Sequence, residues 1–209
     1  MYDLQEQEQI DALKAWWKEN GRVVILTIIA FVVAAAGIQG WRYYQQSQAQ
    51  QAAELYGALQ QLVPENNAKK IRETSATIIE KFSSTAYAPR AALIAAKINY
   101  QAGDAQSAKL QLQWGIDHAA EDELQDIARL RLAGILLDEK NYAQALQLLE
   151  AKHSPSYDAF YLDLKGDVLV AQGKPAEARS TYQAALSKAD KKSNYRDLIQ
   201  IKLDALGAK

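Results

Sequence analysis

The chain has 209 residues, about half of them apolar, and its 24 basic and 25 acidic side chains almost cancel. This composition excludes a disordered tail and suits one domain of ordinary size plus an extra element. A neutral chain without a basic block offers little to a phosphate backbone, so we expect no nucleic-acid partner. The absence of cysteine excludes a disulfide framework, a thiolate metal site and a lipid-bearing cysteine.

The first predicted element is a membrane-spanning helix. No formal charge occurs from Val23 to Trp41, and as a helix these residues would cover about 28 Å, close to the thickness of a bilayer's hydrocarbon core. In lipid the backbone must satisfy its own hydrogen bonds, which favours a helix despite the many Val and Ile residues. We therefore predict a cytoplasmic segment over 1–22, a transmembrane helix with its aromatic flank over 23–44, and a periplasmic domain over 45–209.

The residues that flank this span predict its depth and its orientation. Lys14, Lys18 and Arg22 precede it, whereas only Arg42 follows it before Lys69. By the positive-inside rule the N-terminus then stays in the cytoplasm and the C-terminal part is translocated. The residues that we expect at the two membrane interfaces are Trp16, Trp17, Arg22, Trp41, Arg42, Tyr43 and Tyr44.

Two other interpretations of the apolar stretch stay open. Ala34 to Ala36, before Gly37, would suit a signal-peptide cleavage site. A buried core helix of a soluble protein is the second alternative. The long acidic leader and the aromatic cluster beyond the site favour an uncleaved anchor over both.

The rest of the chain has apolar residues at helical spacing and a repeat of about 34 residues, which predicts stacked helix pairs. The best copy, Ala159 to Ala189, has Gly166 where two helices would pass closely and Gly173 at the turn between them. Its packing residues are Ala178, Tyr182 and Ala185, and two earlier copies repeat the pattern with their own residues at equivalent places. The residues at these places are Ala133, Tyr142, Ala145 and Leu149 in one copy, and Ala96, Gly103, Ala108 and Leu112 in the other.

This small, small, large pattern resembles the tetratricopeptide repeat (TPR). We predict an all-α fold, in which a single N-terminal transmembrane helix precedes an α-solenoid of degenerate TPR-like helix pairs. Residues 45–62 and 68–82 would form a further, poorly matching pair, and a last helix would cap the stack with Leu198, Ile201 and Leu206 on its apolar side. An irregular helical bundle with accidental alanine spacing is the alternative.

Residues that could carry catalysis are sparse, so we predict no enzyme, no cofactor and no metal. His118 and His153 lack the spacing and companions of a metal site. Pro155 marks a turn after His153 that lacks the strand context of a nucleophile elbow. The useful surface is then the groove of the stack.

TPR stacks bind peptides mainly on the face that the first helix of each pair forms. Transferred to this sequence, the resemblance selects a mixed polar and apolar candidate groove for a peptide or partner. Its residues are Arg90, Leu93, Lys97, Tyr100, Ile127, Leu130, Phe160, Asp163 and Asp167.

Over essentially its full length the chain resembles the ancillary subunits of the SecYEG translocon (YfgM type), which are bacterial inner-membrane proteins. The most specific stretches are "KENGR" (Lys18 to Arg22), "GWRYY" (Gly40 to Tyr44) and "KGDVLVAQGKPAEAR" (Lys165 to Arg179). The resemblance implies a single-pass inner-membrane protein whose periplasmic TPR-like domain lies beside the translocon. It also implies a PpiD-like membrane-anchored chaperone and unfolded clients as partners, besides membrane lipid.

Two other functions are compatible with the same architecture. The chain would serve as a scaffold of another inner-membrane or envelope assembly, or as an envelope enzyme with a pocket of convergent titratable groups.

Overall fold

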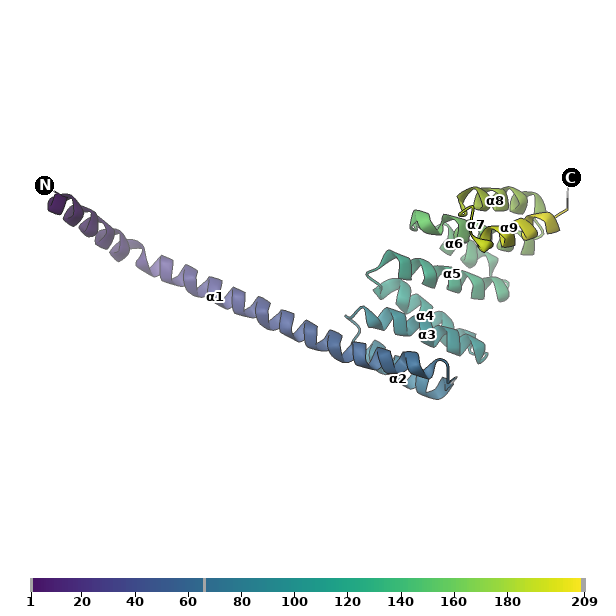
Figure 1. The fold of residues 1–209 in the computed structure, drawn as a ribbon, viewed down its shortest axis with the longest axis horizontal. Helices are drawn as coiled ribbons and strands as arrows, with labels where there is room; N and C mark the ends of the chain where they lie inside the picture. The colour runs from purple at the N-terminus through teal and green to yellow at the C-terminus, as the bar shows by residue number, and fades with distance from the viewer. Residues whose placement is uncertain (1, 66, 208–209) are drawn as a thin grey trace. The chain divides into compact units, whose positions relative to one another are not determined.

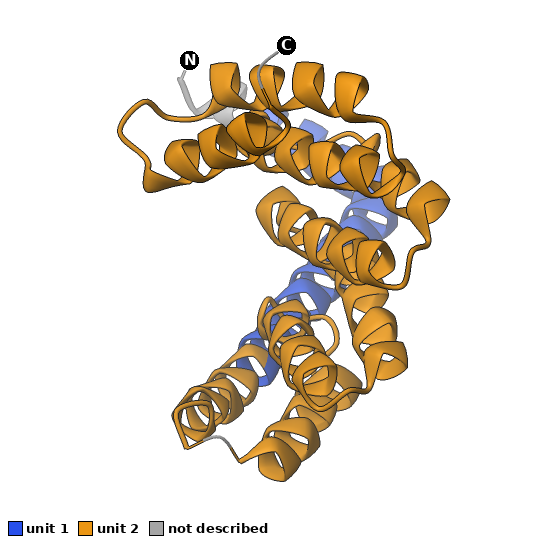
Figure 2. Ribbon diagram, turned by 90° about the vertical axis from the view of Figure 1, so that its right-hand side faces the viewer, with its two compact units in different colours: residues 1–48 blue, residues 49–209 orange. Residues whose placement is uncertain are grey.

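The computed structural model describes residues 2–65 and 67–207. Met1, Asn66 and residues 208–209, which lie within the predicted segments 1–22 and 45–209, are outside the described residues. The chain forms two compact units, Met1–Gln48 and Ala49–Lys209 (Figure 2). The described elements are α1 (Tyr2–Leu62), α2 (Ala68–Lys81), α3 (Tyr87–Gln101), α4 (Ala105–His118), α5 (Asp122–Asp138), α6 (Tyr142–Leu149), the short 3-10 helix η1 (Pro155–Tyr157), α7 (Asp158–Ala171), α8 (Pro175–Lys188) and α9 (Asn194–Ala205) (Figure 1).

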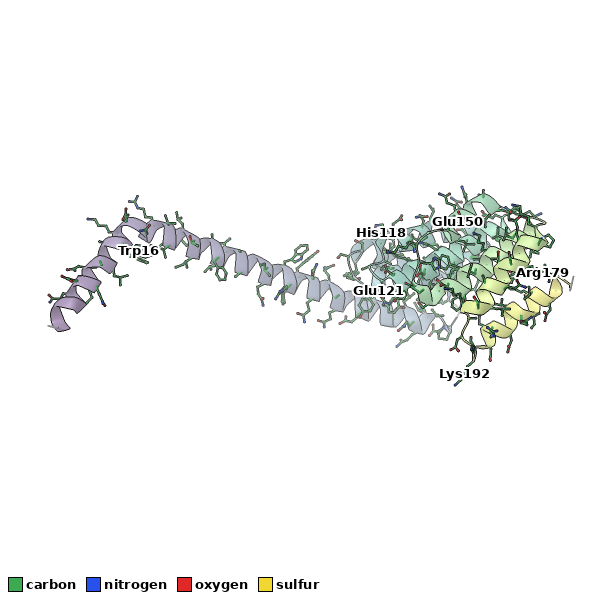
Figure 3. The ribbon with its side chains drawn as sticks, turned by 90° about the horizontal axis from the view of Figure 1, so that it is seen from above. Trp16, His118, Glu121, Glu150, Arg179 and Lys192 are labelled. Carbon is green, nitrogen blue, oxygen red and sulfur yellow. The ribbon has the colours of Figure 1, made fainter. Side chains whose placement is uncertain are left out.

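The first unit consists of the N-terminal part of α1. Its helix is long and apolar enough to cross a membrane, and none of its most apolar stretch is buried. Phe31 and Val33 are 74% and 65% exposed. A core helix of a soluble protein would bury such side chains, so the structure does not support that alternative. Figure 3 shows a bend in this helix near Trp16. Gly21 lies close by, against the ring of Trp17.

The second unit is a stack of helix pairs, as predicted (Figure 2). The C-terminal part of α1 packs with α2 and α3 through Leu59, Ile71 and Ile78, which are fully buried. We call α3, α5 and α7 the A helices, and their partners α4, α6 and α8 the B helices. A central core cluster joins α3 to α7, and a last cluster joins α7 and α8 to α9. The all-α architecture predicted from the repeat is therefore confirmed.

The predicted small residues are buried between packed helices. Ala108, Ala145 and Ala178 occupy the same place in the three B helices, and all are fully buried. At Gly166 the two helices of the last pair are in close contact, because a Cβ atom built there would lie 2.4 Å from Cε1 of Tyr182. Only glycine fits this contact without a shift of its neighbours.

The turn from A helix to B helix is built in the same way in all three pairs. One residue adopts a left-handed conformation in each turn, namely Gly103 (φ 82°), Lys140 (φ 62°) and Gly173 (φ 74°). The amide of the following residue donates a hydrogen bond to a carbonyl in the last turn of the A helix, at 2.9, 2.8 and 2.9 Å respectively. The two glycines were predicted from the sequence, whereas Lys140 holds the same conformation with a side chain that disfavours it.

Helix α9 caps the stack, but its predicted register is wrong. Leu198 and Ile201 are 45% and 65% exposed, whereas Ile199 is fully buried. Leu206 does pack against the last core cluster, together with Tyr195. The buried face also includes Lys202, whose ammonium group binds Asp163 and Asp167 on α7. The stripe of α9 that packs on the stack is therefore Tyr195, Ile199, Leu203 and Leu206 at helical spacing, and Lys202 adds a polar contact beside it.

Candidate functional site

The predicted groove residues lie on the three A helices, but they do not form one continuous open surface. The equivalent positions in the repeat are 90, 127 and 160, then 93, 130 and 163, then 97, 134 and 167. The structure places them in three local environments, between α3 and α5, along α5, and between α7 and α9. Whether any of them contacts a partner stays a prediction.

Between α3 and α5 an open groove of about 240 Å³ remains, which we call the A-face groove. Lys97 and Tyr100, two of the predicted residues, line it. Its other lining residues are Ala96, Leu112, Arg131, Gly134, Ile135 and Asp138. Gly134 leaves open space above the helix, since a Cβ atom there would meet nothing within 4 Å.

The two ends of the A-face groove differ in charge. At one end, Arg131 donates a hydrogen bond to the carbonyl oxygen of Leu93 (3.3 Å), and burial lowers the pKa of its guanidinium. At the other end, the hydroxyl of Tyr100 donates to a carboxylate oxygen of Asp138. This hydrogen bond raises the pKa of Tyr100. The groove therefore offers an apolar floor between a cationic and an anionic end.

Four of the predicted residues contribute to packing between repeats. Leu93 is 7% exposed and belongs to the central core, so its predicted place on an open surface is wrong. Ile127 and Leu130 are half-buried against the same core. Arg90 forms an ion pair with Glu121 at the start of α5 (Nη2 to Oε2, 2.5 Å). These residues are covered because an A helix packs on one side against its own B helix and on another side against the next repeat.

The last three predicted residues contact or flank the cap. Asp163 is only 4% exposed, so it is not an open groove residue either. Its Oδ2 accepts hydrogen bonds from the hydroxyl of Tyr195 (2.6 Å) and from Nζ of Lys202 (2.8 Å). Asp167 accepts from the same ammonium group (2.7 Å). Phe160 remains 39% exposed beside Tyr195, with 4.5 Å between the ring centroids.

These contacts change the pKa values of Lys202 and Tyr195. Burial lowers the pKa of Lys202, but its hydrogen bonds to the two carboxylates outweigh burial and raise the pKa above its ordinary value. Burial, and then the hydrogen bond to Asp163, raise the pKa of the Tyr195 hydroxyl. Near neutral pH Lys202 is therefore an ammonium group and Tyr195 a neutral phenol.

The α5 residues of the groove, namely Arg131, Gly134, Ile135 and Asp138, are not among the predicted residues. Gly134 was discoverable, because it occupies the repeat position of Lys97 and Asp167. Arg131 and Asp138 lie outside that register. Their place in the groove depends on how closely α3 and α5 approach, which the repeat pattern does not specify.

The predicted membrane-interface residues lie in the first unit. Trp16 and Trp17 are 50% and 49% exposed, with ring centroids 6.4 Å apart. Trp41 and Tyr44 lie 6.0 Å apart, and Tyr43 is 76% exposed. Arg22 and Arg42 are also exposed. Amphipathic rings at both ends of an exposed apolar helix are typical of membrane spans.

The two histidines have structural contacts. His118 stacks on Trp114 with 4.2 Å between the ring centroids. His153 stacks on Tyr161 (3.9 Å), and its Nε2 lies 3.2 Å from Oδ1 of Asp158. In the part of the chain that the structure describes, no three His, Asp or Glu side chains are grouped so as to hold a metal ion.

Comparisons with known proteins agree with this architecture. The family of tetratricopeptide repeat-like domains matches residues 14–208. A protein of Haemophilus influenzae named "Ancillary SecYEG translocon subunit" is 31% identical over 188 residues, which cover 88% of this chain and 90% of the relative.

The chain belongs to this family of ancillary SecYEG translocon subunits. A relative of the same name from Neisseria gonorrhoeae is 30% identical over 207 residues, covering 97% of this chain and 98% of its own. The relative from Escherichia coli K12 is 28% identical and covers 96% of both chains. No solved structure matches the chain. The TPR-like fold predicted from the repeat and the predicted family resemblance are both confirmed.

Proposed function

We propose that this protein is a single-pass inner-membrane subunit that associates with the SecYEG translocon and presents its TPR-like domain in the periplasm. The proposal rests on similarity, over nearly the full length, to relatives that are named ancillary SecYEG translocon subunits. The exposed apolar helix supports a membrane anchor. The basic residues before the span support a cytoplasmic N-terminus.

We expect such a subunit to act by binding other proteins, and we assign it no catalysis. An anchored domain beside the channel meets emerging chains at a high effective concentration, so weak and readily released contacts are enough. The A-face groove and the exposed ring of Phe160 are the surfaces of the A helices that we assign to partners. Those partners are a PpiD-like membrane-anchored chaperone and unfolded clients on their way to periplasmic chaperones.

Site-specific crosslinking tests this assignment. A photo-crosslinking residue at Tyr100 or Phe160 should capture the translocon, its chaperone or their clients. A matched residue at exposed Ile201 on the cap should capture them less efficiently. Capture only of components from a different envelope assembly would instead support a scaffold outside the translocon.

A further inference from the structure

A second, larger groove lies on other helices than the A-face groove. Its volume is about 620 Å³, and its walls are the B helices α4 and α6. Leu132 and Leu136 of α5 form its floor. We call it the B-face groove. The wall residues are Gln106, Lys109, Leu110 and Gln113 on α4, and Gln144, Gln147, Leu148 and Ala151 on and just after α6.

On each wall every lining residue lies three or four positions from another in the sequence, so they share one side of their helix, and the two sides face each other across the groove. Leu110 is 61% exposed, and Leu148 on the opposite wall is half-buried, so apolar surface continues from the floor up both walls. Isolated exposed leucines are ordinary on protein surfaces. A leucine on each wall above a leucine floor is a surface suited to an apolar side chain.

The polar part of the lining is almost entirely carboxamide. Four glutamines line the groove, and each carboxamide carries both donors and an acceptor. Gln113 donates to Asp117 (2.9 Å) and Gln144 accepts from Asn141 (2.8 Å), which leaves each of them further hydrogen-bonding capacity.

Lys109 is the one charged residue of the described lining, and an ion pair offsets its charge. Nζ of Lys109 lies 2.7 Å from Oε2 and 2.8 Å from Oε1 of Glu139. The groove therefore presents hydrogen-bonding amides and apolar surface without a free charge from its own lining. A strongly charged ligand would lose its hydration there without gaining an opposite charge.

We infer that the B-face groove binds an extended, uncharged segment of an unfolded polypeptide and recognises its backbone more than its sequence. An extended chain presents N–H and C=O groups along both edges and directs alternate side chains to opposite sides. Glutamines on both walls match the two edges, and the leucine floor accepts the side chains that point inward. This inference rests on the proposed function, since a translocon supplies such segments.

The test is binding of a synthetic peptide to the full-length protein in lipid nanodiscs, followed by fluorescence anisotropy. The probe is a labelled, acetylated and amidated peptide of about ten residues, made of Leu, Ser, Thr and Asn, which in extended form spans about 33 Å. A scrambled peptide should bind with an affinity within about twofold. A peptide N-methylated at alternate residues should bind about tenfold more weakly, because it lacks half of the backbone donors.

Variants locate the site and separate two modes of recognition. Leu110→Arg should weaken binding about tenfold or more. The control is Ile201→Arg, which replaces a similarly exposed aliphatic side chain on α9 and should leave binding unchanged. The double variant Gln106→Leu, Gln147→Leu enlarges the apolar surface but removes two carboxamides. Backbone recognition predicts weaker binding of this double variant, and purely apolar recognition predicts tighter binding.

Several results would overturn the inference. These are no binding at peptide concentrations up to about 1 mM, equal losses for Leu110→Arg and Ile201→Arg, indifference to N-methylation, or tighter binding by the double glutamine variant. Conversion of a dimer to a monomer by Leu110→Arg would instead identify the groove as a contact between two copies. Co-purification of Leu110→Arg with SecYEG, measured in parallel, tests the proposed function separately: retention of SecYEG without peptide binding defeats the inference alone.

Discussion

Replacing Gly166 by alanine should place a methyl group inside a tight contact between α7 and α8. The new Cβ atom would lie 2.4, 2.6 and 2.9 Å from Cε1, Cδ1 and Cζ of Tyr182. The ring cannot retreat freely, because Tyr182 is 2% exposed and its hydroxyl donates to Asp167 at 2.7 Å. Overpacking of this kind costs about 1–3 kcal/mol, and the higher helix propensity of alanine offsets up to about 1 kcal/mol of that.

We therefore expect Gly166→Ala to lower the free energy of unfolding by about 1–2 kcal/mol. For a domain of this size the midpoint of thermal unfolding should fall by about 2–8 °C, as measured by far-UV circular dichroism of the protein in detergent. Gly134→Ala is the matched control, because its Cβ atom meets nothing within 4 Å. It should raise the stability by up to about 1 kcal/mol. Equal shifts in the same direction for both variants would refute the close contact between α7 and α8.

Three further predictions concern a turn, the cap and the membrane topology. Lys140→Gly should stabilise the protein by about 1 kcal/mol, since it removes a side chain from a left-handed conformation, and an unchanged thermal midpoint would contradict this. The raised pKa values of Tyr195 and Lys202 mean that the folded state holds these protons more tightly than the unfolded state. Their contribution to stability is complete below about pH 10 and is lost as the pH rises further, so urea denaturation should give a lower free energy of unfolding at about pH 11 than at about pH 8. In Lys202→Met this difference should shrink, and an unchanged difference would contradict the role of the cap network. Because the chain has no cysteine, a membrane-impermeant maleimide added to spheroplasts should label Lys69→Cys but not Lys14→Cys, and the reverse pattern would contradict the proposed orientation.

The sequence predicts the stack well because its signal is local and repeated. Small residues at positions such as Ala108, Ala145 and Ala178 are buried in every pair, and two of the three turns carry a glycine where a left-handed residue is required. The third turn shows the limit of this reasoning. Lys140 holds the same conformation because hydrogen bonding and packing on both sides outweigh a modest local cost.

The candidate site is less predictable, because exposure depends on neighbours that lie far away in the sequence. Leu93 and Asp163 have the repeat register of open groove residues, yet the next repeat covers the first and α9 covers the second. The packing face of α9 is hard to predict for a related reason. Leu198 and Ile201 form a second apolar stripe next to the one that Ile199 and Leu203 bury, and spacing alone does not choose between the two. The B-face groove gave no sequence signal, since glutamines and leucines on helix surfaces are common.

The most direct test of the central proposal is co-purification of SecYEG with the full-length protein in mild detergent. The comparison is a variant in which an unrelated apolar helix of equal length replaces residues 23–41, so that membrane anchoring is kept. The full-length protein should recover SecYEG together with a membrane-anchored periplasmic chaperone. Recovery of a different envelope assembly in place of the translocon, with SecYEG at the level of an unrelated single-pass control, would contradict the account.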